Sequence, residues 1–174
     1  VSVAVNETLS DTISVPGCVQ MNGYDHMQYI NYLYPIPLDP PYVRVKNPTF
    51  HYRRTFEIND LLKKYYLNFE GVDSFFYVYV NGTPIGYSQI SHATSEWDIT
   101  DYIRAGQNTL DVVVLKWCAA TYLECQDKWR FSGIFRSVYI LSRPRNHIRD
   151  FKIEATLQGG DGILFVHNLS DIAI

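Results

Sequence analysis

Two carboxylates, Glu124 and Asp127, lie three residues apart in a segment that also carries bulky aromatic and basic side chains. The segment spans residues 122–136, and it lacks the small polar composition of a plain connector. Paired carboxyls can hydrolyse a glycosidic bond at separations of about 5–5.5 Å with retention or about 6.5–9.5 Å with inversion. A spacing of three residues in a loop permits either distance and specifies neither. The alternative, which we favour, is that one carboxylate caps the loop or pairs with Arg130 or Arg136.

Aromatic side chains of the same segment could stack on a sugar ring. Trp129 and Tyr122 belong to the predicted loop, where binding groups concentrate. Phe75, Tyr77 and Tyr79 alternate inside a predicted strand, so we expect them to pack in the core or across strands. The loop aromatics are therefore the better candidates for contact with a ligand.

Other chemistry finds little support in the sequence. Asp73, just before the apolar run 75–80, could be a turn residue or a ligand contact. The five histidines show no metal-ligand spacing, which argues against a zinc site. No glycine-rich phosphate loop and no G-x-S-x-G motif is present, and serines such as Ser132 are expected to be structural.

The composition indicates a globular chain without a strongly charged partner. The sequence has 174 residues, of which 47% are hydrophobic, enough for one domain and the start of another. A net charge of −3 argues against nucleic acid or an anionic membrane as the main partner. No apolar run reaches the length of about 18 residues that a membrane span needs. Cys18, Cys118 and Cys125 are expected to be reduced, with a Cys118–Cys125 disulfide as the alternative.

The elements that position these residues are predicted to be strands. Residues 1–49 carry six of the eight prolines and almost no periodicity, which predicts an extended arm of the first domain, pinned by tyrosines. Between residues 50 and 143, short strands alternate with turn signals. The run 75–80 is apolar throughout and predicts a central strand covered on both faces, followed by a hairpin turn at Asn81-Gly82. Residues 100–106 predict one capped helical turn closed by glycine. The pattern predicts an all-β, jelly-roll sandwich.

A second unit is predicted to follow. Arg143-Pro-Arg-Asn146 indicates a linker, after which residues 148–155 alternate again and a glycine-rich turn leads into the apolar run 163–167. We interpret 147–174 as the first strands of another sandwich. Alone, these strands would leave an edge unpaired and an apolar face uncovered.

Gln126-Asp-Lys-Trp-Arg-Phe-Ser-Gly-Ile-Phe-Arg136 has the form Q-D-x-W-R-x-S-G-I-F-R. Three other stretches precede it in order: Gln20-Met-Asn-Gly-Tyr-Asp25 with Tyr34-Pro-Ile36, Pro40-Pro-Tyr-Val43 with Asn47-Pro-Thr49, and Phe69-Glu-Gly-Val-Asp-Ser74 with Val80-Asn-Gly82 and Gly86-Tyr87. Together they resemble bacterial β-galactosidases of glycoside hydrolase family 2 over residues 15–142. Val19 stands where the family often has Trp, and Met27 where it often has Pro. These departures concern the packing of the arm.

The resemblance implies a fold, and it implies that sugar binding and catalysis belong to different domains. It implies an N-terminal jelly-roll (galactose-binding-domain-like) sugar-binding domain, an immunoglobulin-like sandwich whose truncated start is 147–174, and then a (β/α)₈ barrel. The barrel would supply both catalytic glutamates of a retaining reaction. Since a barrel needs about 250 residues, we expect no catalytic residue in this chain, and Glu124 and Asp127 are not expected to be the catalytic pair.

The resemblance also implies two site residues. Asp127 would reach into the barrel's active site, contact the substrate and help to hold a sodium ion. Asp73 occupies a position that is often Asn and touches galactose; its carboxylate keeps the acceptor and lacks the amide donors. Arg130 and Arg136 could hold the loop by charge-assisted hydrogen bonds. Sodium and magnesium are implied for the intact enzyme, and no cofactor for this chain.

The implied activity of the parent enzyme is hydrolysis of terminal non-reducing β-D-galactosides, with this chain inactive alone. The implied partners are the β-galactoside and the catalytic barrel of the same polypeptide, in a cytoplasmic homo-oligomer. Two alternatives stay open. One is a stand-alone carbohydrate-binding module, and the other is a β-glucuronidase or β-mannosidase of the same family.

Overall fold

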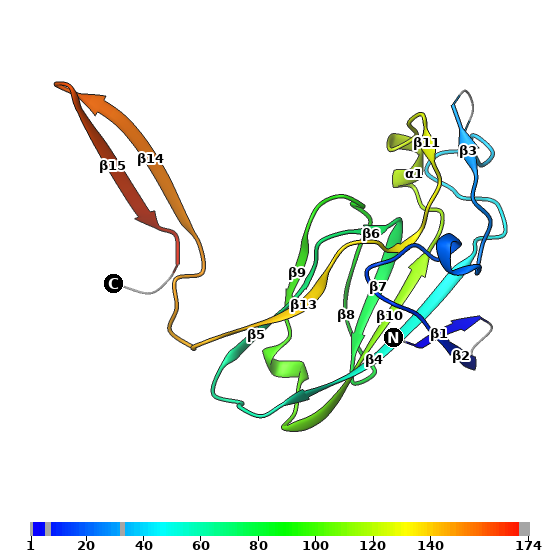
Figure 1. Ribbon diagram of the computed structural model, residues 1–174, viewed down its shortest axis with the longest axis horizontal. Coiled ribbons are helices and arrows are strands. Elements are labelled where there is room, and N and C mark those ends of the chain that lie inside the picture. Colours follow the sequence, from blue (N-terminus) through cyan, green and yellow to red (C-terminus); the bar gives the residue numbers. More distant parts are fainter. Residues whose placement is uncertain (1, 6–7, 32–33, 171–174) are drawn as a thin grey trace.

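Two antiparallel β-sheets face each other in the computed structural model, which describes residues 2–5, 8–31 and 34–170 (Figure 1). The larger sheet has the order β2 (Thr8–Thr12), β1 (Ser2–Val5), β4 (Thr49–Ile58), β10 (Gly106–Leu115), β7 (Phe75–Val80) and β8 (Thr83–Ser88). The smaller sheet has the order β13 (Val138–Arg143), β5 (Lys64–Phe69) and β9 (Ser95–Asp98). The predicted β-sandwich is therefore confirmed.

The core lies between these sheets, where each strand turns alternate side chains inward. Phe69 of β5 packs against Phe76 of β7 with ring centroids 5.1 Å apart, and Trp97 of β9 lies 5.9 Å from Phe69. Burial of each large apolar side chain contributes about 1.5–3 kcal/mol. The large side chains that are fully buried in this core are Val19, Tyr52, Leu67, Phe69, Val72, Phe76, Val78, Val80, Ile99, Val112 and Val114.

Strand β7 corrects one prediction. Its continuous apolar run was expected to be covered on both faces, but burial alternates along the strand. Phe76, Val78 and Val80 point into the core, whereas Tyr77 on the outer face is 41% exposed. Tyr77 lies 4.7 Å from Phe75, ring to ring, so the outer aromatics pack on the sheet surface. An all-apolar run was ambiguous because tyrosine suits both a core and an open sheet face.

The turns follow the local sequence closely. Asn81 and Gly82, with φ of 51° and 79°, join β7 to β8 as predicted. The predicted helical turn at 100–106 is a 3₁₀ turn, η2 (Thr100–Tyr102). Its N-cap position is Ile99, which makes no side-chain cap; Asp98, one residue earlier, accepts a hydrogen bond from the Thr100 backbone N–H at 3.0 Å. Gly106, with φ of 81°, opens β10 and does not close the helical turn.

The first 49 residues are more structured than the predicted extended arm. They contain the β1–β2 hairpin, and β1 pairs with β4 of the larger sheet. They also contain the 3₁₀ turn η1 (Gln20–Asn22) and the short strand β3 (Tyr29–Ile30). Proline density indicated the irregular stretches correctly, and it gave no signal for the hairpin.

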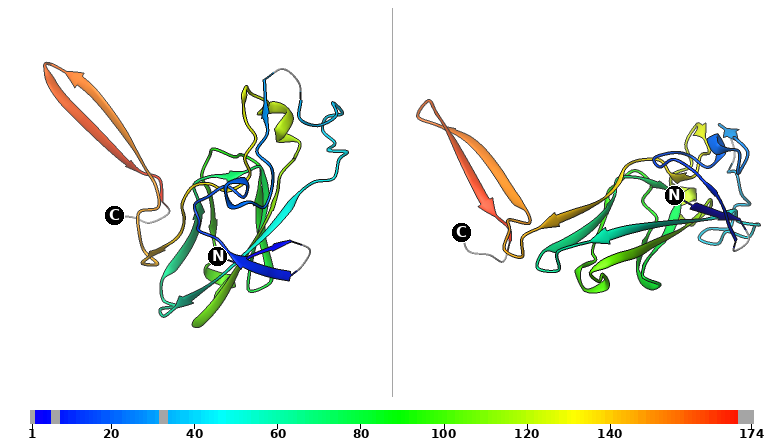
Figure 2. Two further views of the ribbon diagram at one scale, coloured as in Figure 1. Left: turned by 45° about the vertical axis from the view of Figure 1, so that its right-hand side comes forward. Right: turned by 60° about the horizontal axis from the view of Figure 1, so that its bottom comes forward.

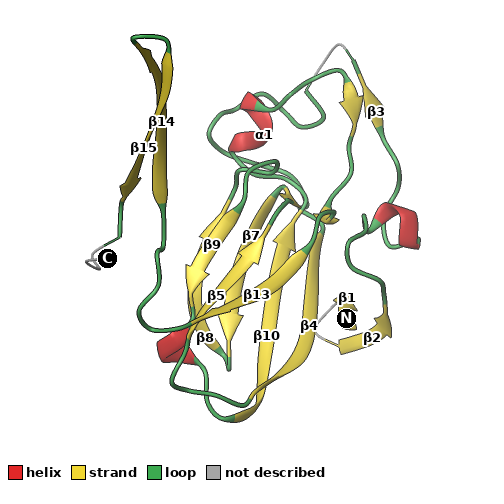
Figure 3. Cartoon of the chain, turned by 60° about the vertical axis from the view of Figure 1, so that its left-hand side comes forward, coloured by secondary structure: helices red, strands yellow, loops and turns green. Residues whose placement is uncertain are grey.

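Two short β-ribbons and a helix lie at one end of the sandwich, and they carry the candidate site residues (Figures 1 and 3). Strand β3 pairs with β11 (Lys128–Trp129), and β6 (Val72–Asp73) pairs with β12 (Gly133–Ile134). Helix α1 (Ala120–Leu123) lies at the same end. The arm and the segment 122–136 are thus adjacent in space although they are about a hundred residues apart.

The hairpin of β14 (Phe151–Gln158) and β15 (Asp161–Asn168) projects from the sandwich in both views of Figure 2. The strands predicted at 148–155 and 163–167 are present with shifted bounds, and their place in an immunoglobulin-like sandwich stays a prediction. None of the described helices has the length and apolar character needed to cross a membrane.

Candidate functional site

Asp127 stands at the tip of the β3–β11 ribbon, where its side chain is exposed. The Tyr29 hydroxyl donates a hydrogen bond to its carboxylate, and this bond raises the pKa of Tyr29. Tyr29 in turn lies 5.5 Å from Trp129, ring to ring, and Trp129 lies 6.4 Å from Phe131. Trp129 is 53% exposed, so the predicted loop presents an acceptor next to an open aromatic face.

Sequence reasoning missed the role of Tyr29. It noted this residue only as one of several tyrosines in the arm, but 98 residues separate the two ends of the Tyr29–Asp127 hydrogen bond. No local spacing signals such a contact. The pairing of β3 with β11 creates it, since Tyr29 stands directly opposite Trp129 in that ribbon.

Asp73 lies behind this tip on β6, opposite Gly133 of β12. Its side chain is only 17% exposed, and the Lys128 ammonium is 3.8 Å from its nearer carboxylate oxygen. Loss of water around the carboxylate raises the pKa of Asp73 to about 6, although the positive charge of Lys128 opposes the rise and the negative charge of Glu124 adds to it. The structure thus brings Asp73 close to the residue that follows Asp127.

Glu124 and Asp127 do not share a partner. Glu124 accepts a 2.8 Å hydrogen bond from the Ser91 hydroxyl, whereas Asp127 is held by Tyr29. The favoured alternative, a loop cap or a pair with Arg130 or Arg136, is not what these contacts show: Ser91 lies outside the segment 122–136, so Glu124 ties that segment to a neighbouring connection. Nothing in these contacts joins the two into an acid/base pair.

Arg130 braces the loop from beneath. It is 4% exposed, and its guanidinium donates to the Gln126 carbonyl at 2.9 Å and lies 3.2 Å from the Cys125 sulfur. The predicted bracing role of Arg130 is confirmed, with a carbonyl acceptor. Arg136 instead donates to the His92 carbonyl at 3.2 Å, so its predicted role in this loop is wrong.

Buried polar contacts tie the arm to the loop. The Gln20 amide donates to the Ser132 hydroxyl at 2.8 Å and to Asp25 at 2.8 Å, and it accepts from the Ser132 N–H at 2.9 Å. Lys116 completes the network as the ion-pair partner of Asp25. Ser132 is therefore structural, as predicted.

Tyr122 is also structural, which corrects its prediction as a stacking candidate. It is 8% exposed, and its hydroxyl lies 2.6 Å from the Pro37 carbonyl and 2.8 Å from the Tyr42 carbonyl. Its ring pins the proline-rich stretch instead of facing a ligand. All three cysteines are free, so the alternative Cys118–Cys125 disulfide is wrong.

For a sodium ion, the loop end of the sandwich offers one ligand, the Asp127 carboxylate. Asp127 is exposed and offers carboxylate oxygens, the donor type that hard cations prefer. Among the described residues, no group of three His, Cys, Asp or Glu side chains could hold a metal ion. Asp127 is therefore no complete cation site among the described residues, and its exposed carboxylate is chemically suited to supply one ligand of a site that other groups would complete.

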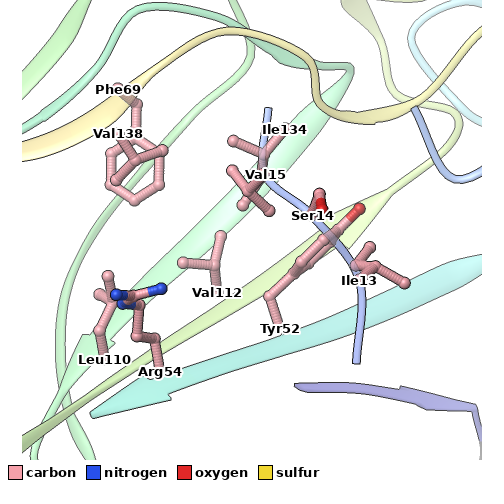
Figure 4. Close-up of a pocket in the computed structure, with 10 residues that line it drawn as sticks. All are labelled: Ile13, Ser14, Val15, Tyr52, Arg54, Phe69, Leu110, Val112, Ile134 and Val138. Atoms are coloured by element: carbon pink, nitrogen blue, oxygen red, sulfur yellow. The ribbon is translucent and has the colours of Figure 1, made fainter. Parts of the chain in front are cut away.

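Two of the hollows in the described part of the chain help to locate the site. One of about 370 Å³ lies beside Asp127 and is lined by Ile30, Asn31, Tyr34, Leu38, Cys125 and Gln126 as well. Another of about 540 Å³ lies between the sheets, with Arg54 and Leu110 at one end and Ile13 and Ser14 at the other (Figure 4). Asp73 and Asp127 do not line the larger hollow, so the predicted site residues belong to the loop end of the sandwich.

Comparison with known proteins agrees with this architecture. Residues 3–144 match the family described as "Glycosyl hydrolases family 2, sugar binding domain". A "Beta-galactosidase" of Staphylococcus xylosus is 52% identical over 154 residues, which are 87% of this chain and 16% of that protein. A "Beta-galactosidase" of Actinobacillus pleuropneumoniae is 54% identical over 145 residues, which are 83% and 14% of the two chains.

Solved structures share the fold at lower identity. An FMN-binding β-glucuronidase from Facaelibacterium prausnitzii L2-6 superposes with a TM-score of 0.70 at 20% identity, covering 98% of this chain and 27% of that one. This chain spans about a sixth of the length of the curated relatives that it matches. From its sandwich, its loop and these matches, the chain belongs to glycosyl hydrolases family 2, of which it forms the sugar-binding domain.

Proposed function

We propose that this chain is the N-terminal sugar-binding domain of a β-galactosidase. The whole enzyme hydrolyses terminal non-reducing β-D-galactosides with retention, and both catalytic glutamates belong to the barrel of the same polypeptide. The support is that relatives at 52% and 54% identity carry this name and are about six times longer. The site agrees with it, because Glu124 and Asp127 are engaged separately.

The observation that carries the proposal is the exposed Asp127 tip. A carboxylate aligned by Tyr29 and flanked by the open ring of Trp129 forms one wall of a polar pocket with an apolar face. Sugar rings combine these two surfaces, and a neighbouring domain can complete a pocket with a few such groups. Asp127 then accepts a sugar hydroxyl and ligates the sodium ion, while Asp73 contacts the galactose from behind.

Assays of the parent enzyme and of this chain test the proposal. The parent enzyme should release nitrophenol from the β-galactoside in preference to the β-glucuronide and the β-mannoside, and this chain alone should release none. Preference for the glucuronide or the mannoside would replace the assigned sugar. Turnover by the pure chain would refute the assignment of catalysis to the barrel.

Calorimetry distinguishes the stand-alone carbohydrate-binding module. A module should bind galactosides without any barrel. We expect no measurable heat, because a single exposed wall makes too few contacts to offset the entropy lost on binding. The predicted magnesium requirement, cytoplasmic location and homo-oligomeric state stay predictions.

A further inference from the structure

Asp73 is an enclosed carboxylate that receives no hydrogen bond from the residues that the structure describes. Its side chain is 17% exposed, and within the part of the chain that the structure describes its one charged neighbour in ion-pair range is Lys128, at 3.8 Å. That distance is too long for a hydrogen bond. The carboxylate still meets solvent, since neither of its oxygens is among the fully buried atoms without a partner, so a ligand group can reach the unfilled acceptors.

The other enclosed aspartates are satisfied. Asp111 accepts from the Arg53 guanidinium at 2.7 Å and also lies 2.5 Å from the His51 ring nitrogen. Asp25 receives the Gln20 amide at 2.8 Å and the Lys116 ammonium. The fold therefore supplies donors to buried acids where they are structural. Asp73 is the exception, and it lies at the loop end of the sandwich.

Among the described residues, the charged groups around Asp73 are engaged elsewhere, apart from Lys128 and the Nε atom of Arg130, which is buried without a hydrogen-bond partner. Glu124 accepts from Ser91, Arg130 donates to loop carbonyls, and Lys116 pairs with Asp25. These side chains line the same small cavity as Asp73 and Lys128. The Asp73 carboxylate, which lacks a donor within the described ranges, and the Lys128 ammonium, which lacks an acceptor there, both line this small cavity.

The cavity has the size of one hydroxyl group. Its volume is about 10 Å³, room for roughly one water-sized oxygen atom. Because the Lys128 nitrogen and the Asp73 oxygen are 3.8 Å apart, one oxygen atom can lie about 2.8 Å from both. A hydroxyl is the group that can donate to the carboxylate while it accepts from the ammonium.

We propose that Asp73 and Lys128 form a hydroxyl-binding notch that takes one hydroxyl of the sugar substrate. The hydroxyl donates its proton to the Asp73 carboxylate, and its oxygen accepts a hydrogen bond from the Lys128 ammonium. Lys128 is thereby a substrate-binding residue. The inference rests on the proposed function. It adds that two side chains share the recognition of one hydroxyl: Asp73 is the acceptor and Lys128 is the donor, whereas an asparagine amide would supply both.

The notch predicts a coupling between one substrate hydroxyl and Lys128 in the parent enzyme. The probes are nitrophenyl β-galactoside and its 2-, 3-, 4- and 6-deoxy analogues. In the unmodified enzyme, one analogue should lose about tenfold or more in kcat/KM, because a polar site rejects a ligand that leaves its buried groups unpaired. In Lys128→Met the same analogue should lose less than about threefold relative to the normal sugar.

A rescue separates binding from a structural role. Asp73→Asn in the Lys128→Met background should restore most of the kcat/KM, because the amide supplies both an acceptor and a donor. Lys63→Met is the matched control, since Lys63 lies 3.7 Å from Asp60 on the exposed surface. It should leave every deoxy ratio unchanged. Lys128→Gln, which keeps a donor, serves if the Met variant folds poorly.

The outcomes separate the two proposals. Deoxy ratios that are identical in the unmodified enzyme, Lys128→Met and Asp73→Asn would overturn the notch, even though the enzyme cleaves galactosides. An enzyme that cleaves none of the β-galactosides would overturn the proposed function, and the sugar-binding notch with it. If Lys128→Met no longer loses kcat/KM with the one deoxy analogue that the unmodified enzyme rejects, and Asp73→Asn in that background restores kcat/KM, the notch and the proposed function are both supported.

Discussion

At the scale of the residue, Asp127 is distinguished by exposure. Asp25 and Asp111 are each bound by two side chains of the fold, whereas among the described residues Asp127 is held by an exposed tyrosine hydroxyl alone. Its contacts contribute little to folding, since surface hydrogen bonds and ion pairs are worth at most about 1 kcal/mol. The free carboxylate oxygens are therefore available to a ligand.

Asp127→Ala should separate activity from stability. In the parent enzyme we expect kcat/KM to fall about tenfold or more and the stimulation by sodium to disappear, because the proposed sugar contact and the proposed cation ligand would both be lost. In this chain the free energy of unfolding should change by less than about 0.5 kcal/mol. Asp39→Ala, which removes an exposed carboxylate beside Arg44, is the matched control. Wild-type kinetics and an unchanged sodium response in Asp127→Ala would refute the assignment.

Asp73 should make stability depend on pH. Its pKa is raised by burial to about 6 from an ordinary value of 3.8, so the folded state binds more protons than the unfolded state between these values. Stability therefore falls as pH rises through that window. Asp73→Asn should gain on the order of 2 kcal/mol relative to the unmodified chain at pH 7.5, and the gain should vanish near pH 4.

Urea unfolding of both chains at pH 4, 6 and 7.5 measures this difference. Asp60→Asn, which removes an exposed carboxylate beside Lys63, is the matched control. A difference between Asp73→Asn and the unmodified chain that stays constant over the three pH values would show that burial does not raise this pKa.

At the scale of the element, the loop depends on a glycine at its return into the sandwich. Gly133 of β12 has φ of 109°, and a Cβ atom there would lie 2.6 Å from the Tyr52 hydroxyl and 3.3 Å from the Gly17 carbonyl. Backbone conformation and close packing both require glycine. Because Gly133 stands opposite Asp73, the same contact aligns the ribbon that carries the notch.

Gly133→Ala should lower the free energy of unfolding by about 2 kcal/mol or more, from backbone strain together with overpacking. Chemical denaturation of this chain measures the loss. Gly162→Ala is the control, since a Cβ at this β15 glycine meets no atom within 4 Å. Equal stabilities for the two variants would mean that β12 adjusts its backbone without cost.

Local rules predicted the elements, and long-range pairing escaped them. Asn81-Gly82 predicted its hairpin because the turn needs two residues with positive φ, which those types tolerate. The alternation of β7 was hidden because its outward residues are aromatic. Tyr29, Lys128 and the β1–β2 hairpin were missed for a different reason. Tyr29 and Lys128 acquire their roles from partners distant in sequence, which no short pattern encodes. The β1–β2 hairpin pairs locally, and what the sequence did not signal is its addition to the distant strand β4.

At the scale of the whole molecule, the chain consists of a packed sandwich and a hairpin that stands apart from it (Figure 2). The strand register places Phe151, Ile153 and Leu157 on the same face as Leu164 and Val166 of the partner strand. All five side chains are more than half exposed. The hairpin touches the sandwich through few groups, chiefly Arg149, whose guanidinium lies 3.0 Å from Glu96 and 4.7 Å from the Tyr66 ring centroid.

Removal of residues 147–174 should therefore leave the sandwich intact. An exposed ion pair and a cation–π contact are each worth about 1 kcal/mol or less, so we expect the free energy of unfolding to fall by at most about 1–2 kcal/mol. Exposed apolar strands promote association, so the shorter chain should also remain monomeric at higher concentration. Denaturation and sedimentation measure these two effects.

Ile153→Lys with Val166→Glu, which makes the same face polar in the full chain, should reproduce the drop in association without the truncation. If the truncated chain instead unfolded at a much lower urea concentration, the hairpin would be part of the sandwich's cooperative unit, and the boundary predicted at residues 143–146 would be wrong.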